Sequence, residues 1–184
     1  MRESWSSGLR PPWPPVLDLP ADSPLRELTA RAPAVVIFLR SFGCTFCREA
    51  MADVAAQQSA IRAAGANIAF VHGGTPEEAA PWFAKYGLAD VARISDPNLD
   101  HYRAFGLGRT GAGAIVDPRV WTRGAVCALS HGFGTQTVEM MRQLPGVFVV
   151  QHDTVLAEYR HRSPADRPDY AALARAATSA TPRR

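Results

Sequence analysis

Two cysteines separated by two residues, Cys44 and Cys47, are the side chains of this sequence best suited to do chemistry. They follow an apolar run at residues 34–39 and open a helical pattern, so we expect them where a buried strand turns into a helix. At such a junction, free backbone N–H groups and the positive end of the helix dipole stabilise an anion and lower the pKa of the first thiol. We therefore predict that Cys44 is the reactive thiolate and the more exposed of the two.

Cys47 lies one helical turn after Cys44 and on the same face. This spacing brings the second sulfur close enough to attack an oxidised sulfur at Cys44 and to close a disulfide. A nucleophile with a shielded resolving partner needs this arrangement. The pair therefore predicts thiol redox chemistry.

A zinc site is the alternative use of these cysteines. Cys127 and His131, four residues apart on an expected helix, could complete a four-ligand set with Cys44 and Cys47. The protein would then be a non-enzymatic zinc-binding or interaction module. Compact zinc modules bring their ligand pairs closer in sequence, and the apolar neighbours of Cys127 suggest core packing. We accordingly expect no metal and interpret Cys127 as a small buried hydrophobe.

The composition indicates one globular domain. The chain has 184 residues, of which 47% are hydrophobic and 20% charged. Its net charge of +3 comes from arginines scattered along the whole sequence, which argues against a nucleic-acid partner. Three cysteines are too few for a disulfide framework, so a CxxC among them is better explained by redox or metal chemistry.

The sequence gives no sign of a membrane segment. The run at residues 34–39 is far shorter than the ~20 apolar residues that cross a bilayer. The N-terminus is polar and proline-rich and lacks the apolar stretch of a secretory signal. We therefore expect a cytoplasmic protein.

The expected elements alternate early and end in a hairpin. Residues 1–16 should form an extended proline-rich arm, residues 17–178 the domain and residues 179–184 a disordered tail. Strands are expected at 34–39, 67–71, 91–94, 147–150 and 154–159, and helices after Ser23-Pro24 and Asp96-Pro97 and at 45–64, 75–86, 118–129 and 168–177. This order predicts an α/β fold with a mixed central sheet and helices on both faces.

The segment from Val36 to Glu49 resembles the active-site segment of the peroxiredoxin-like AhpC/TSA-type antioxidant proteins, in the branch of the thioredoxin superfamily related to the selenoprotein L redox proteins. Three further segments resemble that branch: residues 96–107 with Tyr-x-x-Phe-Gly-Leu, residues 143–150, and residues 159–168. The resemblance covers roughly residues 20–177. It implies a thioredoxin-like fold and thiol redox chemistry at Cys44 and Cys47.

The resemblance also implies an activity. Either Cys44 reduces a peroxide and its sulfenic acid is resolved by Cys47, or the pair exchanges disulfides as thioredoxins do. A thioredoxin- or glutathione-type reductant would restore the dithiol. No cofactor is expected, because the Gly-x-Gly-x-x-Gly match at residues 106–111 follows a helix instead of a strand.

Relatives of this kind carry Pro-x-x-x-Thr/Ser-x-x-Cys. Ser41 occupies the hydroxyl position, but Ile37 replaces the proline, so we expect Cys44 to be less shielded and peroxide reduction to be slow. The arginine that supports Cys44 is sought among Arg40, Arg160 and Arg162, and we assign Arg160.

Two further residues are expected near the cysteines. Pro145, just before a strand, matches the cis-proline position of thioredoxin-like folds, although a trans proline at a strand start explains it nearly as well. His72 ends the second strand and should emerge at the same sheet edge as Cys44, either as a turn residue or as a proton relay.

Overall fold

The computed structural model describes residues 16–109, 118–134, 140, 142–163 and 165–179. The arm expected at residues 1–16, apart from Val16, and the tail, apart from Ser179, lie outside these residues. So does most of the loop expected at 108–113. Val16 already pairs with Thr154, and the Leu17 N–H donates to the Asp153 carbonyl at 2.6 Å, so the chain joins the domain from there on.

A five-stranded mixed sheet forms the centre of the molecule, in the order β3-β2-β1-β4-β5. Within it, β1 runs parallel to β2 and β2 parallel to β3, while β4 is antiparallel to both β1 and β5. The strands are β1 (Ala34–Leu39), β2 (Asn67–His72), β3 (Ala92–Ser95), β4 (Gly146–Gln151) and β5 (Thr154–Arg160). The prediction of a mixed sheet, parallel in its first half and closed by a hairpin, is confirmed.

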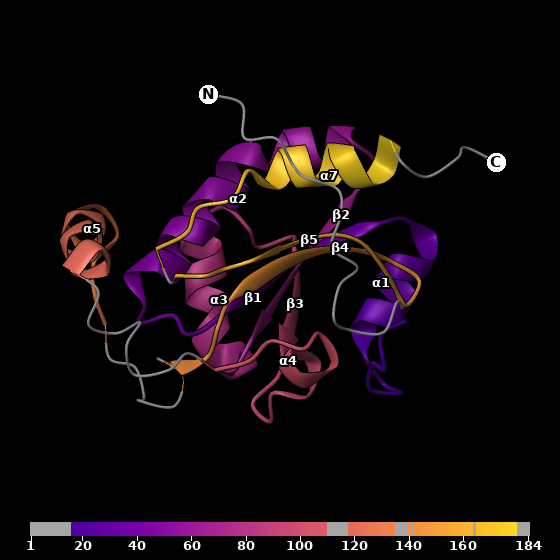
Figure 1. Ribbon diagram of the computed structural model, residues 1–184, viewed down its shortest axis with the longest axis horizontal. Coiled ribbons are helices and arrows are strands. Elements are labelled where there is room, and N and C mark those ends of the chain that lie inside the picture. Colours follow the sequence, from indigo (N-terminus) through magenta and orange to yellow (C-terminus); the bar gives the residue numbers. More distant parts are fainter. Residues whose placement is uncertain (1–15, 110–117, 135–139, 141, 164, 180–184) are drawn as a thin grey trace.

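Helices cover both faces of this sheet (Figure 1). They are α1 (Pro24–Arg31), α2 (Thr45–Ala63), α3 (Pro76–Lys85), α4 (Asp100–Ala104), α5 (Pro118–His131) and α7 (Tyr170–Ser179). Residues of α2, α3 and α7 pack with Val35, Ile37 and Leu39, whereas residues of α1 and α4 pack with the alternate side chains Val36 and Phe38. Alternation along β1 therefore divides the core into two layers, and all six of its residues are buried.

Two helix starts differ from the expected positions. The helix expected at Asp96-Pro97 begins at Asp100, because the Asp96 carboxylate accepts hydrogen bonds from the backbone N–H groups of Asp100 and His101 four and five residues later. The last helix begins at Tyr170 instead of Pro168. By contrast, α3 starts as predicted, with a reciprocal capping box between Thr75 and Glu78.

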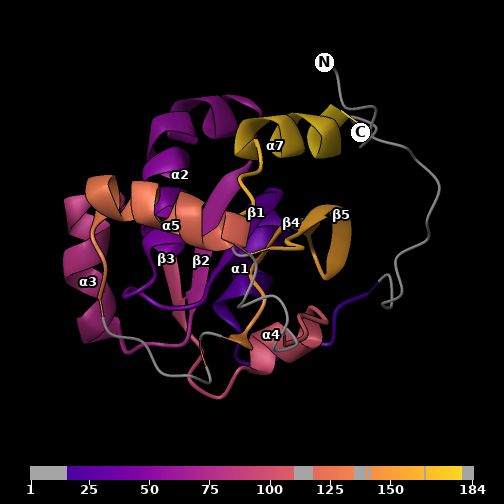
Figure 2. The same ribbon diagram turned by 60° about the vertical axis from the view of Figure 1, so that its left-hand side comes forward.

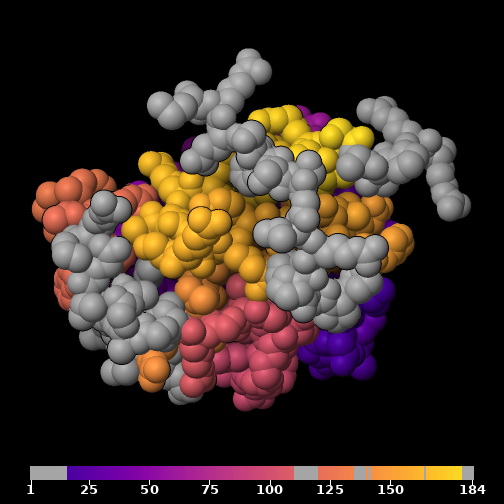
Figure 3. Space-filling view, in the orientation of Figure 1, coloured from indigo at the N-terminus to yellow at the C-terminus, as the bar shows by residue number. Residues whose placement is uncertain are grey.

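The two ends of the domain meet around β5. In the space-filling view, β5 and the segment after it lie between α7 and α4 (Figure 3). Among the described residues, no helix combines the length and the hydropathy needed to cross a membrane.

Candidate active site

The cysteine pair lies where β1 leads into α2, as predicted. Cys44 is the N-cap of α2 and Cys47 lies in its first turn. The Cys44 N–H donates to the Ser41 carbonyl at 3.3 Å, and the Cys44 carbonyl accepts from the Cys47 N–H at 3.1 Å. A tight turn at residues 41–43 thus turns the chain from the strand into the helix and places both sulfurs at the carboxyl end of β1.

Arg40 contacts both sulfurs. Its guanidinium donates to Cys44 Sγ at 2.9 Å, and its backbone N–H donates to Cys47 Sγ at 3.3 Å. Arg40 is itself buried, with 6% of its surface exposed. In this water-poor setting, charge-assisted hydrogen bonds are stronger than on the surface.

These contacts shift the pKa values of the two thiols in opposite directions. A hydrogen bond from the Cys47 thiol, followed by the charge of Arg40, lowers the pKa of Cys44 to about 5, against the opposing effect of burial. The pKa of Cys47 is raised well above its ordinary value, first by that same hydrogen bond to Cys44 and then by burial. Cys44 is therefore the thiolate of the pair, and Cys47 keeps its proton.

The prediction that Cys44 is exposed is wrong. Only 2% of Cys44 and 4% of Cys47 is accessible to solvent. Ile37, which was expected to leave Cys44 less shielded, is itself buried in β1 and does not open the site. Hydrogen bonds and the charge of Arg40, and not contact with water, keep Cys44 ionised.

The other two candidate arginines are engaged elsewhere. The Arg160 guanidinium donates to the carbonyls of Phe105 and Gly106, both at 2.7 Å, and lies over the Phe148 ring. Arg162 is exposed in the turn after β5. The contact with the Cys44 sulfur that we expected of Arg160 is thus made by Arg40, which follows directly from its position at the end of β1.

Ser41, Pro145 and His72 lie around the cysteine turn in different ways. Ser41 contributes its carbonyl to the turn. No peptide bond in the described part of the chain is cis, so Pro145 takes the trans alternative, and it lines the same pocket as Cys47. His72 is buried at the end of β2, with Nδ1 3.0 Å from the Gly74 carbonyl, and burial lowers its pKa. These contacts favour its interpretation as a turn residue.

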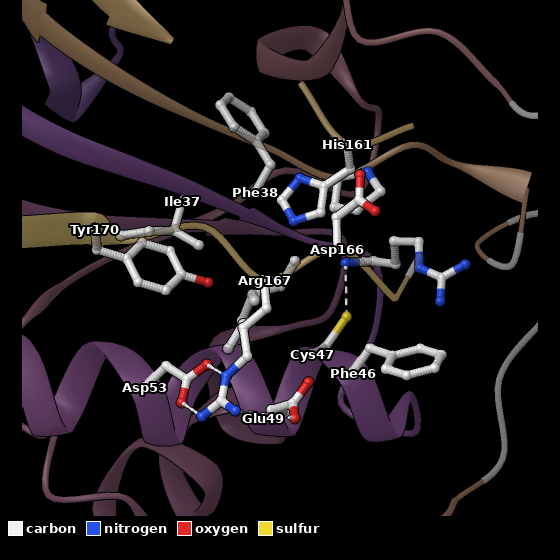
Figure 4. A pocket seen from close by; sticks show the side chains of 14 residues that line it. Ile37, Phe38, Phe46, Cys47, Glu49, Asp53, His161, Asp166, Arg167 and Tyr170 are labelled. Carbon is white, nitrogen blue, oxygen red and sulfur yellow. Dashed lines mark hydrogen bonds and ion pairs between the residues drawn. The ribbon is translucent and has the colours of Figure 1, made fainter. Parts of the chain in front are cut away.

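A pocket opens on the Cys47 side of the pair and is lined by polar side chains that the sequence analysis missed (Figure 4). Arg167 forms a bidentate ion pair there with Asp53 of α2. His161 is buried in the same pocket, and its Nδ1 has no hydrogen-bond partner among the described residues. Burial lowers the pKa of His161 to about 4, so the ring is neutral. The residues converge from α2 and from the segment after β5, a long-range pairing that no local pattern reveals.

Cys127 lies on α5 and is buried, as predicted. Its thiol donates to the Thr45 carbonyl at 3.7 Å, and burial raises its pKa. Within the described part of the chain, the set expected for zinc does not form as a unit. Cys127 and His131 are instead joined by Glu49.

Comparisons with known proteins place this geometry in a family. Residues 53–164, more than half of the chain, match the family model of the AhpC/TSA antioxidant enzymes. The chain belongs to the AhpC/TSA family. The expectation of a thiol-dependent oxidoreductase is thereby confirmed, although the matched span begins nine residues after Cys44 and leaves the roles of the two cysteines to the geometry.

Solved structures agree with this AhpC/TSA assignment at the level of the fold. Reduced Prx3 from Vibrio vulnificus superposes with a TM-score of 0.60 at 15% identity, over 91% of this chain and 95% of that one. The peroxidoxin BcpB from Mycobacterium tuberculosis gives 0.56 at 17% identity over 86% of each chain. The bacterioferritin comigratory protein of Xanthomonas campestris gives 0.53 at 18% identity, over 83% of this chain and 79% of that one. The thioredoxin-like fold is confirmed, and none of the curated proteins matches the sequence.

Proposed function

We propose that the protein reduces peroxides, with Cys44 as the nucleophile and Cys47 as the resolving thiol. The observation that carries this proposal is the contact of the Arg40 guanidinium with Cys44 Sγ at 2.9 Å. It holds a thiolate beside a fixed cation in a buried site, which is the arrangement that a displacement on oxygen requires.

In the first step, the Cys44 thiolate attacks one peroxide oxygen. The S–O bond forms as the O–O bond breaks, and the departing oxygen takes up a proton and leaves as water or an alcohol. Cys44 is oxidised to a sulfenic acid and the peroxide is reduced. Arg40 lies where it would stabilise the negative charge as this charge moves from sulfur to the departing oxygen, and we assign the Ser41 hydroxyl as a second donor to the peroxide.

In the second step, Cys47 attacks the sulfur of the sulfenic acid. The S–S bond forms, the S–O bond breaks, and the hydroxyl leaves with the Cys47 proton as water. The pair closes a disulfide within one chain because both residues belong to the same helical turn. A dithiol of the thioredoxin type, or glutathione, then reduces the disulfide in the cytoplasm.

A second candidate is disulfide exchange without peroxide. The CxxC pair at the N-terminus of α2 favours it, since Cys44 is also suited to attack a disulfide and Cys47 to release the mixed intermediate. The two candidates use the same cysteines and differ in the electrophile.

Stopped-flow kinetics with hydrogen peroxide and an organic hydroperoxide separate them. We expect wild-type protein to consume peroxide, slowly because Cys44 is buried, Cys44→Ser to abolish turnover, and Cys47→Ser to stop at a sulfenic acid that a dimedone-type reagent traps. If wild type and Cys44→Ser consume peroxide equally slowly while wild type alone reduces a model disulfide, disulfide exchange is the function.

A further inference from the structure

A cluster of three potential metal ligands joins α5 to α2, outside the cysteine pair. Glu49 of α2 and Cys127 and His131 of α5 each offer one donor atom, and these atoms lie within 4.8 Å of one another. Figure 2 shows α5 crossing beside the start of α2. We propose that Glu49, Cys127 and His131 bind a zinc ion, with a fourth position left for water or a small ligand.

The donor set fits this metal. Thiolate sulfur, imidazole nitrogen and carboxylate oxygen are the three ligand types of protein zinc sites. Around a tetrahedral zinc ion, such donors stand roughly 3.5 Å apart, given bond lengths of about 2.0–2.3 Å. The donors therefore need to approach by up to about 1.3 Å, which rotation of the partly exposed His131 side chain can supply in large part, since the Glu49 side chain is 14% exposed and paired with Arg123.

Helix geometry holds two of the ligands in register. Cys127 and His131 are four residues apart on α5 and therefore share one face. The Arg48 guanidinium donates to the His131 carbonyl at 3.0 Å and holds this end of α5 against α2, whereas the hydrogen bond from the Cys127 thiol to the Thr45 carbonyl belongs to the metal-free protein and is given up when the thiol loses its proton to zinc. The site would form without any movement of the two helices.

Two arginines surround the carboxylate of the cluster. Arg123 donates to Oε2 of Glu49 at 2.7 Å, and Arg167 lies 4.0 Å from Oε1. Both arginine cations repel a zinc ion, but the negative charges of the Cys127 thiolate and the Glu49 carboxylate together balance the two positive charges of zinc. Arg123 can keep one carboxylate oxygen while zinc takes the other, as donors in the outer shell of metal sites do.

The test must keep zinc away from the redox cysteines. The full chain carrying Cys44→Ser and Cys47→Ser, in a thiol-free reductant, is titrated with Co²⁺ and then with Zn²⁺. We expect one equivalent of Co²⁺ to produce a thiolate-to-metal charge-transfer absorption, which carboxylate and imidazole alone cannot give, and Zn²⁺ to displace it. If the serine protein does not fold, the Cys44→Ala, Cys47→Ala protein takes its place.

Single substitutions in that background locate the site. Cys127→Ser should abolish the charge-transfer absorption, and His131→Ala and Glu49→Gln should each weaken binding at least about tenfold. His152→Asn is the matched control: this exposed histidine has a φ of 51°, which asparagine also adopts, and its replacement should leave affinity unchanged.

Three outcomes would overturn the site. The first is no charge-transfer absorption in the serine protein, and the second is an absorption that survives Cys127→Ser. The third is zinc bound by the wild-type chain, which keeps Cys44 and Cys47, and not by the serine protein. The last would assign the metal to the CxxC pair. Because the redox cysteines are absent from the test protein, its result is independent of the proposed peroxidase activity.

Discussion

The side chain and the backbone of one residue, Arg40, act on different sulfurs. The guanidinium donates to Cys44 and the backbone N–H donates to Cys47. Any displacement of Arg40 therefore changes the ionisation of one cysteine and the position of the other. Substituting Arg40, with Arg160 as the control, is therefore the most direct test of which arginine supports Cys44.

Replacing Arg40 by methionine should raise the pKa of Cys44 above about 5, because it removes a cation that favours the thiolate, while the hydrogen bond from Cys47, the larger cause of the low pKa, stays in place. The titration of the thiolate should therefore move to higher pH than in wild type. The ultraviolet absorbance of the thiolate, followed against pH in a Cys127→Ala background, measures this. Arg160→Met is the matched control and should leave the curve in place. A shift in Arg160→Met alone would return the role to Arg160.

Cys44 should react with an alkylating agent before Cys127 does at neutral pH. Both thiols are buried, so access does not favour Cys44, but Cys44 is ionised, whereas burial raises the pKa of Cys127 and keeps it protonated. Partial labelling followed by peptide mass mapping gives the order of reaction. Cys127→Ala should retain peroxide turnover, and a loss of turnover in this variant would make Cys127 part of the redox machinery.

At the scale of elements, α4 holds the end of β1 that carries Arg40. The Tyr102 hydroxyl, fully buried on α4, donates to the Leu39 carbonyl, and its ring packs edge-on against Phe38 4.9 Å away. A helix on the opposite face of the sheet from α2 therefore supports the strand end from which the active site is built.

Tyr102→Phe should lower the free energy of unfolding by about 1–3 kcal/mol, because it removes a buried hydrogen bond and leaves a backbone carbonyl without its donor. Chemical denaturation measures the loss. Tyr86→Phe is the control, since its half-buried hydroxyl has no hydrogen-bond partner among the described residues, and it should change stability by much less. Equal effects in the two variants would contradict a supporting role for Tyr102.

Local signals in the sequence predicted these elements well. Ser23-Pro24 and Thr75-Pro76 each start a helix, and the β-branched run at residues 34–39 is a buried strand. The helix predicted to begin at Asp96 begins four residues later, at Asp100. The reason is that the Asp96 side chain accepts a hydrogen bond from the Asp100 N–H and so caps a helix that starts only after an intervening turn. The cysteine pair was also evident locally, whereas the pairing of Arg167 with Asp53 spans 114 residues and depends on the packing of the finished fold.

At the scale of the whole molecule, the redox site is buried between α2 and the strand ends, with a pocket on the Cys47 side. Both sulfurs already interact in the dithiol state, as the mutual hydrogen bond that shifts their pKa values indicates. Formation of a disulfide therefore requires a local adjustment of the first turn of α2 and no separation of elements.

Oxidation with one equivalent of peroxide should accordingly remove two hydrogens from a single chain, and change amide hydrogen exchange only around residues 40–48. Intact mass, peptide mapping and hydrogen exchange of the two forms test this together. Cys47→Ser is the control, because it cannot close the bond. A disulfide between chains, one that includes Cys127, or altered exchange throughout α5 would show that a larger rearrangement is needed.

The lowered pKa of Cys44 also affects the reduction potential of a disulfide between Cys44 and Cys47. At pH 7, lowering a thiol pKa from 9.0 to about 5 stabilises the dithiol form roughly a hundredfold, and each factor of ten corresponds to about 30 mV in a two-electron couple. The reduction potential of the Cys44–Cys47 couple is thereby raised by about 60 mV. In the proposed cycle, the Cys44–Cys47 disulfide would consequently be readily reduced, and a mild dithiol would suffice to restore the reactive thiolate.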